Sequence, residues 1–119
     1  MILEYEQLLS LANRPDRKEP MMDATVSATA VNASCGDACT VHLKVINGVI
    51  TDADFDAKGC VISRASAAVI VDHAIGVINS ARSMNGDSVR SLLGVAISPL
   101  RERCLTTPLK ALQDAISNL

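Results

Sequence analysis

The chain reads TVHLKVINGVITDADF over residues 40–55, and this stretch decides its fold. Apolar and polar side chains alternate in its first half, so that Val41, Leu43 and Val45 fall on one side of an extended chain and His42 and Lys44 on the other. An Asn-Gly pair follows at 47–48, which is the pair that a two-residue hairpin turn favours, and residues 49–55 return as the partner strand. The stretch therefore predicts an antiparallel β-hairpin.

The segments on either side of the hairpin complete an α+β pattern. Upstream, the sequence predicts a helix over 2–11, a charged loop between prolines over 15–20, and a strand over 24–31 that leads into a loop over 32–37. Downstream, it predicts helices over 60–75 and 79–84, then a helical turn through Leu92 and Leu93 that is capped by Asp87 or Ser88. A final helix begins close to Cys104 and carries a stripe formed by Leu105, Leu109, Leu112, Ile116 and Leu119. We therefore expect a small antiparallel three-stranded sheet with helices packed on one face, in a single domain spanning residues 1–119.

Composition and charge exclude several classes of function. The 119 residues are 49% hydrophobic and 20% charged, with a net charge of -2, and they include one Tyr, one Phe and no Trp. A chain that has no excess of positive charge, and few aromatic side chains on which bases could stack, is expected to bind nucleic acid poorly. The first residues are acidic where a secretory signal would be basic, and no apolar run approaches the roughly 18 residues of a membrane span. We therefore expect a cytoplasmic protein without a nucleic-acid or membrane partner.

Cysteines mark the candidate site. In a reducing compartment, four cysteines are expected to be metal ligands or reactive thiols rather than disulfides. Cys35 and Asp37 follow the first strand, Cys60 opens a helix and Cys104 precedes the last one, so different elements can bring three thiols and one carboxylate to one point. Because a helix N-terminus favours the thiolate form, Cys60 and Cys104 are expected to be thiolates. Cys39 is expected to be a small core residue and not a primary ligand.

The donor set of three thiolates and one carboxylate suits two kinds of cargo. It can hold zinc tetrahedrally, or it can hold an iron–sulfur cluster, for which four thiolates are the usual ligands. Asp37 then stands where the fourth thiolate would be. A hard oxygen donor matches sulfide-bound iron less well than a thiolate does, so the site should release a cluster more readily than a four-cysteine site would. The spacing of the cysteines leaves both cargoes open.

Two motifs carry a resemblance to a known family. They are NASCGD, residues 32–37, and GCVISRAS, residues 59–66, and a glycine at 76 and a late third cysteine follow them. With the N-terminal helix and the loop at Asn13-Arg14-Pro15, this pattern resembles the iron–sulfur cluster assembly scaffolds of the IscU, SufU and NifU N-terminal type. The resemblance implies a SufE/NifU-like α+β fold. It also implies that Cys35, Asp37, Cys60 and Cys104 bind a [2Fe-2S] cluster or iron, with zinc as the alternative occupant.

The same resemblance implies the partners. A cysteine desulfurase would deliver sulfur as persulfide, with Cys35 and Cys104 as the candidate sulfur acceptors, and the finished cluster would pass to recipient apo-proteins. Two copies of the chain could share a cluster as a homodimer. The family resemblance favours a non-enzymatic scaffold, with sulfurtransferase activity as the alternative if the chain is SufU-like.

The chain departs from the family pattern near its third cysteine. IscU proteins have a histidine before that cysteine and a Leu-Pro-Pro-Val-Lys motif upstream, whereas this chain has Arg103 and Ile97-Ser98-Pro99-Leu100-Arg101. The resemblance therefore does not extend to a dedicated Hsp70-type chaperone. Arg101 resembles an arginine that lies near the site in SufU, and it could pair with Asp37 when metal leaves or simply face solvent. The interval from Cys60 to Cys104 is 44 positions (104 minus 60), too short for the insertion typical of SufU, so the subfamily stays open.

Overall fold

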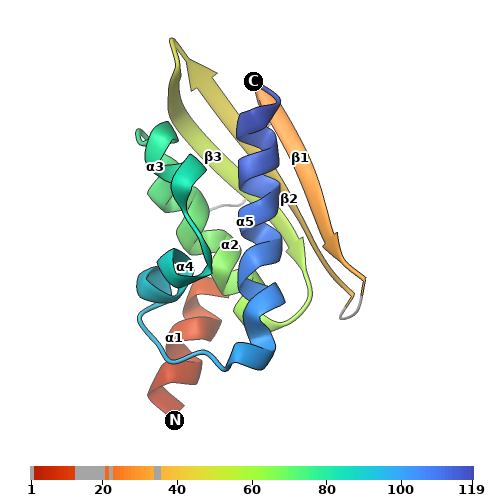
Figure 1. The fold of residues 1–119 in the computed structure, drawn as a ribbon, viewed down its shortest axis with the longest axis vertical. Coiled ribbons are helices and arrows are strands. Elements are labelled where there is room, and N and C mark those ends of the chain that lie inside the picture. Colours follow the sequence, from red (N-terminus) through yellow and green to blue (C-terminus); the bar gives the residue numbers. More distant parts are fainter. Residues whose placement is uncertain (1, 13–20, 22, 34–35) are drawn as a thin grey trace.

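A computed structural model describes residues 2–12, 21, 23–33 and 36–119. Its elements, in chain order, are α1 (Ile2–Ala12), β1 (Val26–Asn32), β2 (Asp37–Ile46), β3 (Val49–Lys58), α2 (Val61–Ala74), α3 (Ile78–Ser83), α4 (Gly86–Leu93), the short 3-10 helix η1 (Pro99–Arg101) and α5 (Glu102–Ser117). The strands form one antiparallel sheet in the order β1-β2-β3, and α2 and α5 lie along one face of it (Figure 1). This confirms the expected α+β architecture. The loop expected at 15–20 and the Asn13-Arg14-Pro15 segment lie outside the described residues.

The hairpin forms where the sequence predicts it. Asn47 and Gly48 both have positive φ, 52° and 76°, which is the backbone that a tight turn between twisted strands requires. Both strands of the hairpin extend further than their alternation suggests, because β2 begins at Asp37 and β3 continues to Lys58. As a result, β1 and β2 stay paired as far as Asn32 opposite Asp37, and the predicted loop over 32–37 is shorter than expected.

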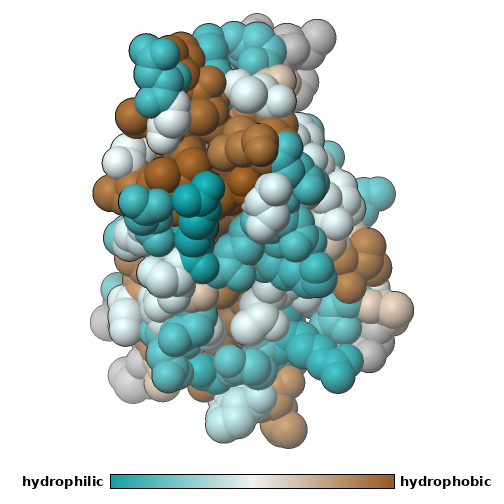
Figure 2. All heavy atoms as spheres, turned by 45° about the horizontal axis from the view of Figure 1, so that its top comes forward, coloured by the Kyte–Doolittle hydropathy of each residue, from teal (hydrophilic) through white to brown (hydrophobic). Residues whose placement is uncertain are grey.

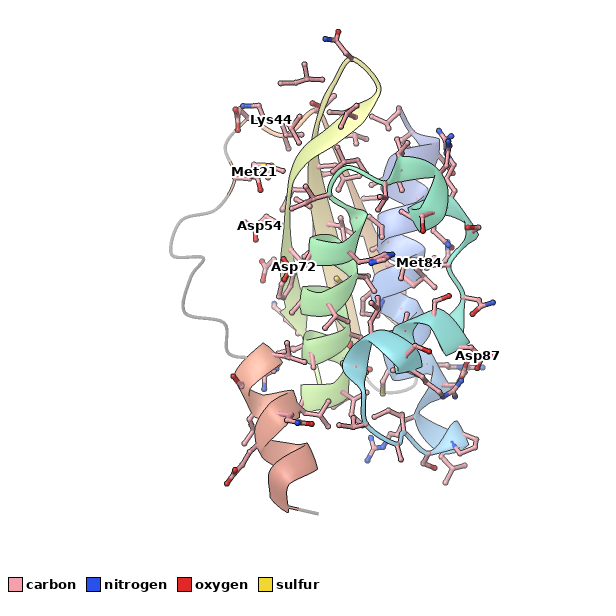
Figure 3. All side chains as sticks on the ribbon, turned by 90° about the vertical axis from the view of Figure 1, so that its left-hand side faces the viewer. Met21, Lys44, Asp54, Asp72, Met84 and Asp87 are labelled. Carbon is pink, nitrogen blue, oxygen red and sulfur yellow. The ribbon has the colours of Figure 1, made fainter. Side chains whose placement is uncertain are left out.

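The core lies between one face of the sheet and the helices. Val41 and Leu43 of β2 are fully buried there, and α5 covers them with the predicted stripe, of which Leu105, Leu109, Leu112 and Ile116 are buried. Leu119 was expected on the same stripe but is half exposed, because α5 ends at Ser117. Lys44 and Asp54 project from the other side of the sheet, away from α5 (Figure 3). The helical layer is therefore one-sided, and all four buried leucines and isoleucines of the stripe face the sheet.

Helix ends follow local side-chain chemistry. Cys60 is the N-cap of α2, as the sequence predicts. The N-cap of α4 is Asn85, so the expected cap at Asp87 or Ser88 is wrong. The Asn85 side chain accepts the backbone N–H of Ser88, and the Ser88 hydroxyl accepts that of Asn85, which satisfies two N–H groups that the helix leaves unpaired. Ser88 is therefore a partner in the capping box rather than the cap itself.

An ion pair ties α4 to the start of α5. Arg90 of α4 binds the carboxylate of Glu102, the first residue of α5, and also donates to Asp87 at 3.0 Å. Gly86 lies close to the Glu102 carboxylate as well, since a Cβ on Gly86 would come within 2.2 Å of Glu102 Oε1. These contacts fix the first turn of α5, in which Cys104 is the third residue.

Exposed apolar side chains gather where β2 and α2 end. Ile46 and Val49 flank the hairpin turn, Ile75 and Val77 follow α2, and all four are at least 40% exposed. A backbone hydrogen bond from Gly76 to Ile50 joins the two segments. Figure 2, in which the top of the Figure 1 view comes forward, shows hydrophobic residues collected on this end of the molecule. Among the described residues, no helix is long and apolar enough to cross a membrane.

Candidate metal centre

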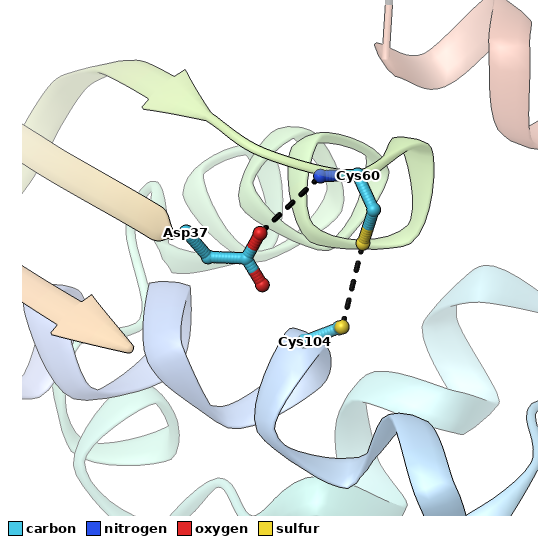
Figure 4. Close-up of side chains that lie close together, drawn as sticks. All are labelled: Asp37, Cys60 and Cys104. Atoms are coloured by element: carbon cyan, nitrogen blue, oxygen red, sulfur yellow. Dashed lines mark hydrogen bonds between the residues drawn. The ribbon is translucent and has the colours of Figure 1, made fainter. Parts of the chain in front are cut away.

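Three predicted ligands from three distant segments converge at one end of the fold. Asp37 is the first residue of β2, Cys60 caps α2, and Cys104 lies in the first turn of α5. One ligand atom from each residue lies within 4.8 Å of the other two (Figure 4). Cys35, the fourth predicted ligand, lies outside the described residues, so its place in the centre stays a prediction.

The two described thiols are in direct contact. Cys60 Sγ donates to Cys104 Sγ across 3.3 Å. Cys60 Sγ also accepts the backbone N–H of Ser63 at 3.4 Å, which is the hydrogen bond of a helix N-cap made by sulfur instead of oxygen. The cap holds Cys60 Sγ over the first turn of α2, on the side where α5 delivers Cys104.

One oxygen of the Asp37 carboxylate accepts a hydrogen bond, and the other has no partner. Asp37 is 1% exposed, and its Oδ1 accepts the backbone N–H of Cys60 at 3.3 Å. Its Oδ2 is buried without a hydrogen-bond partner and lies on the side of the two sulfurs in Figure 4. A buried carboxylate oxygen without a partner is costly, so this atom is placed to meet a ligand that the site receives.

Gly59 makes room for this carboxylate. A Cβ on Gly59 would lie 2.0 Å from Asp37 Oδ1, closer than any side chain allows. Gly59 also has φ of 131°, a backbone that L residues rarely adopt. The glycine before Cys60 therefore lets β3 and α2 wrap around Asp37.

Burial sets the protonation state of Cys104. The side chain is 2% exposed, and burial raises its pKa to about 12, assisted by the hydrogen bond and negative charge of Cys60 and by the charge of Asp37. The expectation that Cys104 is a thiolate is therefore wrong for the metal-free protein, because desolvation outweighs the helix N-terminus. A metal that binds here must displace the thiol proton, so metal binding releases protons.

The remaining candidates lie around the centre rather than in it. Cys39 points into the core from β2, and burial first, then the charge of Asp56, raises its pKa to about 12. It is not part of the cluster of ligand atoms, as predicted. Arg101 is exposed and lines a cavity of about 250 Å³ together with Cys60 and Leu8. Among the described residues, no ion pair joins Arg101 to Asp37.

Two polar residues at the centre were not singled out from the sequence. Asn32 is buried at the end of β1 directly opposite Asp37, and Ser63 is buried in the first turn of α2. The signal for Asn32 was available, because it shares the inward parity of Ala28 and Ala30 on the same strand. Ser63 lies three residues after the capping cysteine, a position that faces back toward the cap.

The donor set fits a thiophilic metal. Two thiolates on one tetrahedral zinc ion, each about 2.3 Å from the metal, lie about 3.8 Å apart. The Cys60–Cys104 sulfur distance of 3.3 Å needs to open by only about half an ångström to reach that value. The free Oδ2 of Asp37 supplies an oxygen donor beside the sulfurs, so the described residues offer three of the four positions of such a centre.

Known proteins are similar to this chain over nearly its whole length. The sequence matches the model of the NifU-like N-terminal domain over residues 4–119. It is 33% identical to the iron-sulfur cluster assembly scaffold protein IscU of Thermotoga maritima, covering 96% of this chain and 92% of that protein. It is 26% identical to the zinc-dependent sulfurtransferase SufU of Bacillus subtilis, covering 95% of this chain and 89% of that protein.

Solved structures share the fold. The N-terminal part of a nitrogen-fixing NifU-like protein from Brucella abortus superposes with a TM-score of 0.71 at 22% identity, covering 94% of this chain and 90% of that one. A candidate SUF-system scaffold from Fervidobacterium islandicum gives a TM-score of 0.73 at 23% identity, covering 93% and 94%. With the family model spanning nearly the whole sequence and the cysteine–aspartate centre in place, the chain belongs to the IscU/SufU/NifU family of NifU-like N-terminal domains.

Proposed function

We propose that this chain is a scaffold on which a [2Fe-2S] cluster is assembled from iron and desulfurase-derived sulfur and then passed to apo-proteins. The observation that carries the proposal is the convergence of the Asp37 carboxylate with the Cys60 and Cys104 thiols within 4.8 Å. Cys35 completes the proposed ligand set. The cluster is the cargo of this protein, and the chain supplies its ligands.

Sulfur would reach the site from a cysteine desulfurase. A site thiolate attacks the outer sulfur of the desulfurase persulfide, the sulfur–sulfur bond breaks, and the desulfurase cysteine leaves as a thiolate. Cys35 and Cys104 are the proposed acceptors. Because burial raises the pKa of Cys104 to about 12, Cys104 can attack only after it loses its proton, which a bound metal would favour. Arg101 beside Cys60 would guide the anionic persulfide into the shared cavity.

Release of the cargo would depend on Asp37. Its carboxylate is a weaker match for sulfide-bound iron than a thiolate, and a backbone N–H already occupies Oδ1. A centre with three thiolates and this oxygen donor holds a cluster less firmly than four cysteines would. The weak fourth position suits a protein that gives its cluster away.

The second candidate is a zinc-dependent sulfur acceptor for the desulfurase. It is favoured by the similarity to the Bacillus subtilis protein and by the sulfur pair, whose separation is close to that of two zinc ligands. In this case zinc would be the resident metal and the chain would act as a sulfurtransferase. It would stimulate desulfurase turnover and would not retain a cluster.

Anaerobic reconstitution decides between the two. Protein purified without oxygen is analysed for metal, then incubated with iron, cysteine, a cysteine desulfurase and dithiothreitol, which reduces the persulfide sulfur to sulfide. The scaffold proposal expects a visible sulfide-to-iron chromophore in the wild-type protein and its loss in Cys35→Ala. A colourless product, together with bound zinc and faster desulfurase turnover, would establish the sulfur acceptor instead.

We also propose a cellular location, a domain organisation and an oligomeric state. The described cysteines are all free thiols, as a reducing compartment requires, and we place the protein in the cytoplasm. We treat residues 1–119 as a single domain. Cys60 is partly exposed at one end of the fold, so we include a homodimer in which two copies share one cluster.

A further inference from the structure

We infer that Asn32 and Ser63 are positioning residues that donate hydrogen bonds to the ligands of the loaded metal centre. Neither is a metal ligand. The inference rests on the proposed function, because it requires the centre to bind a metal or a cluster. It assigns a role to the two buried polar side chains that the ligand set leaves unexplained.

The inference starts from the buried polar atoms that lack a hydrogen-bond partner, which lie at the metal centre. Among the described residues, the buried side-chain nitrogen and oxygen atoms without a hydrogen-bond partner are Asn32 Nδ2, Asp37 Oδ2 and Ser63 Oγ. Folded proteins rarely leave such atoms unpaired, because each costs free energy when it leaves water. Here one belongs to the proposed ligand set, and the other two belong to residues directly beside it.

Asn32 neighbours the carboxylate across the sheet. It is the register partner of Asp37 in the β1–β2 pair, and both side chains point to the buried face. Directly opposed residues in an antiparallel pair have Cβ atoms roughly 5 Å apart, so a small side-chain rotation would bring the Asn32 amide to the Asp37 carboxylate or to a ligand bound beside it. Asn32 is 6% exposed, so water is largely excluded from its Nδ2.

Ser63 neighbours the sulfurs. Its own backbone N–H binds Cys60 Sγ at 3.4 Å, and its side chain is completely buried. Ser66, one turn further along the same helix and equally buried, instead donates its Oγ to the carbonyl of Ile62 at 2.7 Å. Ser63 lies in the first turn of α2, where the residue four positions earlier, Gly59, precedes the N-cap, and its hydroxyl stays without a partner.

The chemistry of a loaded centre explains why donors stand beside it. The Asp37 carboxylate and the two sulfurs lie together, yet neither the Asn32 Nδ2 nor the Ser63 Oγ makes a hydrogen bond to any of them. A metal or cluster takes the thiol protons away and leaves thiolates and sulfide, which are acceptors only. The amide N–H groups of Asn32 and the hydroxyl of Ser63 are donors, and hydrogen bonds to charged acceptors are the stronger kind. Such outer hydrogen bonds orient metal ligands and contribute to affinity.

Single substitutions test this on the full chain, with zinc and cobalt as the probes. The variants are Ser63→Ala and Asn32→Ala, and Ser66→Ala is the matched control because it removes a buried hydroxyl that is already paired. Zinc affinity is measured by competition with a chromophoric chelator. The thiolate-to-cobalt charge-transfer band is recorded on Co²⁺-loaded protein, and the melting temperature is recorded on metal-free protein.

We expect Ser63→Ala and Asn32→Ala each to lower zinc affinity by about tenfold or more. The charge-transfer band of Ser63→Ala should move to longer wavelength, because a thiolate that loses a hydrogen bond gives up an electron more easily. The metal-free melting temperature of Ser63→Ala should stay the same or rise, since an unpaired buried group is removed. Ser66→Ala should show the reverse pattern, with a lower metal-free melting temperature and zinc affinity within about twofold of the wild type.

Unchanged zinc affinity and an unchanged cobalt band in a folded Ser63→Ala protein would overturn the inference while leaving the proposed function standing. If Asn32→Ala fails to fold, Ser63→Ala alone decides. A wild-type protein that binds neither zinc, cobalt nor a cluster would contradict the proposed function itself, and this inference with it.

Discussion

The Sγ atoms of Cys60 and Cys104 lie 3.3 Å apart although 44 positions separate the two residues in the chain. One sulfur caps α2 and the other sits in the first turn of α5, so the contact reports how the two helices converge on the sheet. Asp37 is the third member of the group, and its Oδ1 accepts a hydrogen bond from the backbone N–H of Cys60. The packing of the two helices on the sheet therefore brings the three side chains together.

Replacing Cys104 tests the sulfur pair. Cys104→Ser removes one soft donor and should lower zinc affinity by ~100-fold or more, because a neutral hydroxyl is a poor zinc ligand. Chelator competition measures the change, and circular dichroism checks that the helices persist. Cys39→Ala is the matched control, since Cys39 is also a buried cysteine but lies outside the ligand cluster. Equal losses in the two variants would mean that Cys104 has no special role.

Gly59→Ala should damage the centre through the carboxylate. The new Cβ would meet Asp37 Oδ1 at 2.0 Å, so the carboxylate must move, and the backbone at φ of 131° adds strain of about 1–3 kcal/mol. Gly76→Ala is the control, because Gly76 also has positive φ, 81°, but its Cβ would meet nothing within 4 Å. We expect both variants to lose stability in urea unfolding and only Gly59→Ala to lose zinc affinity. Normal zinc binding by Gly59→Ala would show that Asp37 need not stay where it is.

Stability of the metal-free protein should fall in strong base. Cys39 titrates near 9.0 in the unfolded chain and near 12 in the fold, so between these values the unfolded state gives up a proton that the folded state keeps. The stabilisation is thus complete below pH 9 and is lost as the pH rises toward 12. Removing the thiol in Cys39→Ala should flatten the decline by up to about 1.4 kcal/mol per pH unit. Urea unfolding across this range in the presence of a chelator measures both slopes, and identical slopes would contradict the buried-thiol explanation.

Arg101 should act on sulfur delivery and not on metal binding. It lines the cavity next to Cys60 but forms no ion pair with Asp37 in the part of the chain that the structure describes. Arg101→Ala should therefore keep zinc affinity within about twofold, while sulfur transfer from the desulfurase falls by roughly tenfold. Arg82→Ala, an exposed arginine on α3, is the control for loss of surface charge. A large change in zinc affinity for Arg101→Ala would argue that it supports the centre directly.

The sequence predicted the parts of the fold that follow regular patterns. Alternation identified the buried face of β2, and the Asn47-Gly48 pair located the turn that its positive φ values confirm. The start of β2 was missed because Asp37 points inward, where alternation predicts an apolar side chain. Asp37, the polar residue that breaks the alternation, is a proposed metal ligand, so the prediction failed at the candidate site.

The sequence predicted where two of the candidate ligands lie in the fold, but not their protonation. Spacing and motif placed Cys60 and Cys104 at helix starts, which the structure confirms. The protonation of Cys104 could not be read from the sequence, because it depends on how deeply tertiary packing buries the thiol. Ser63 was missed for a similar reason, since a missing hydrogen-bond partner is visible only when the neighbours are in place, whereas the inward parity of Asn32 on β1 could have marked that residue.

The lifetime of the cluster in Asp37→Ala shows whether this carboxylate makes the scaffold release its cargo. Wild-type and variant proteins are reconstituted without oxygen, and the visible absorbance is followed with and without a recipient apo-protein. The variant should keep its cluster longer and transfer it more slowly, because the weak oxygen donor that promotes release is gone. A cluster with the same lifetime and the same transfer rate in both proteins would show that Asp37 does not promote cluster release.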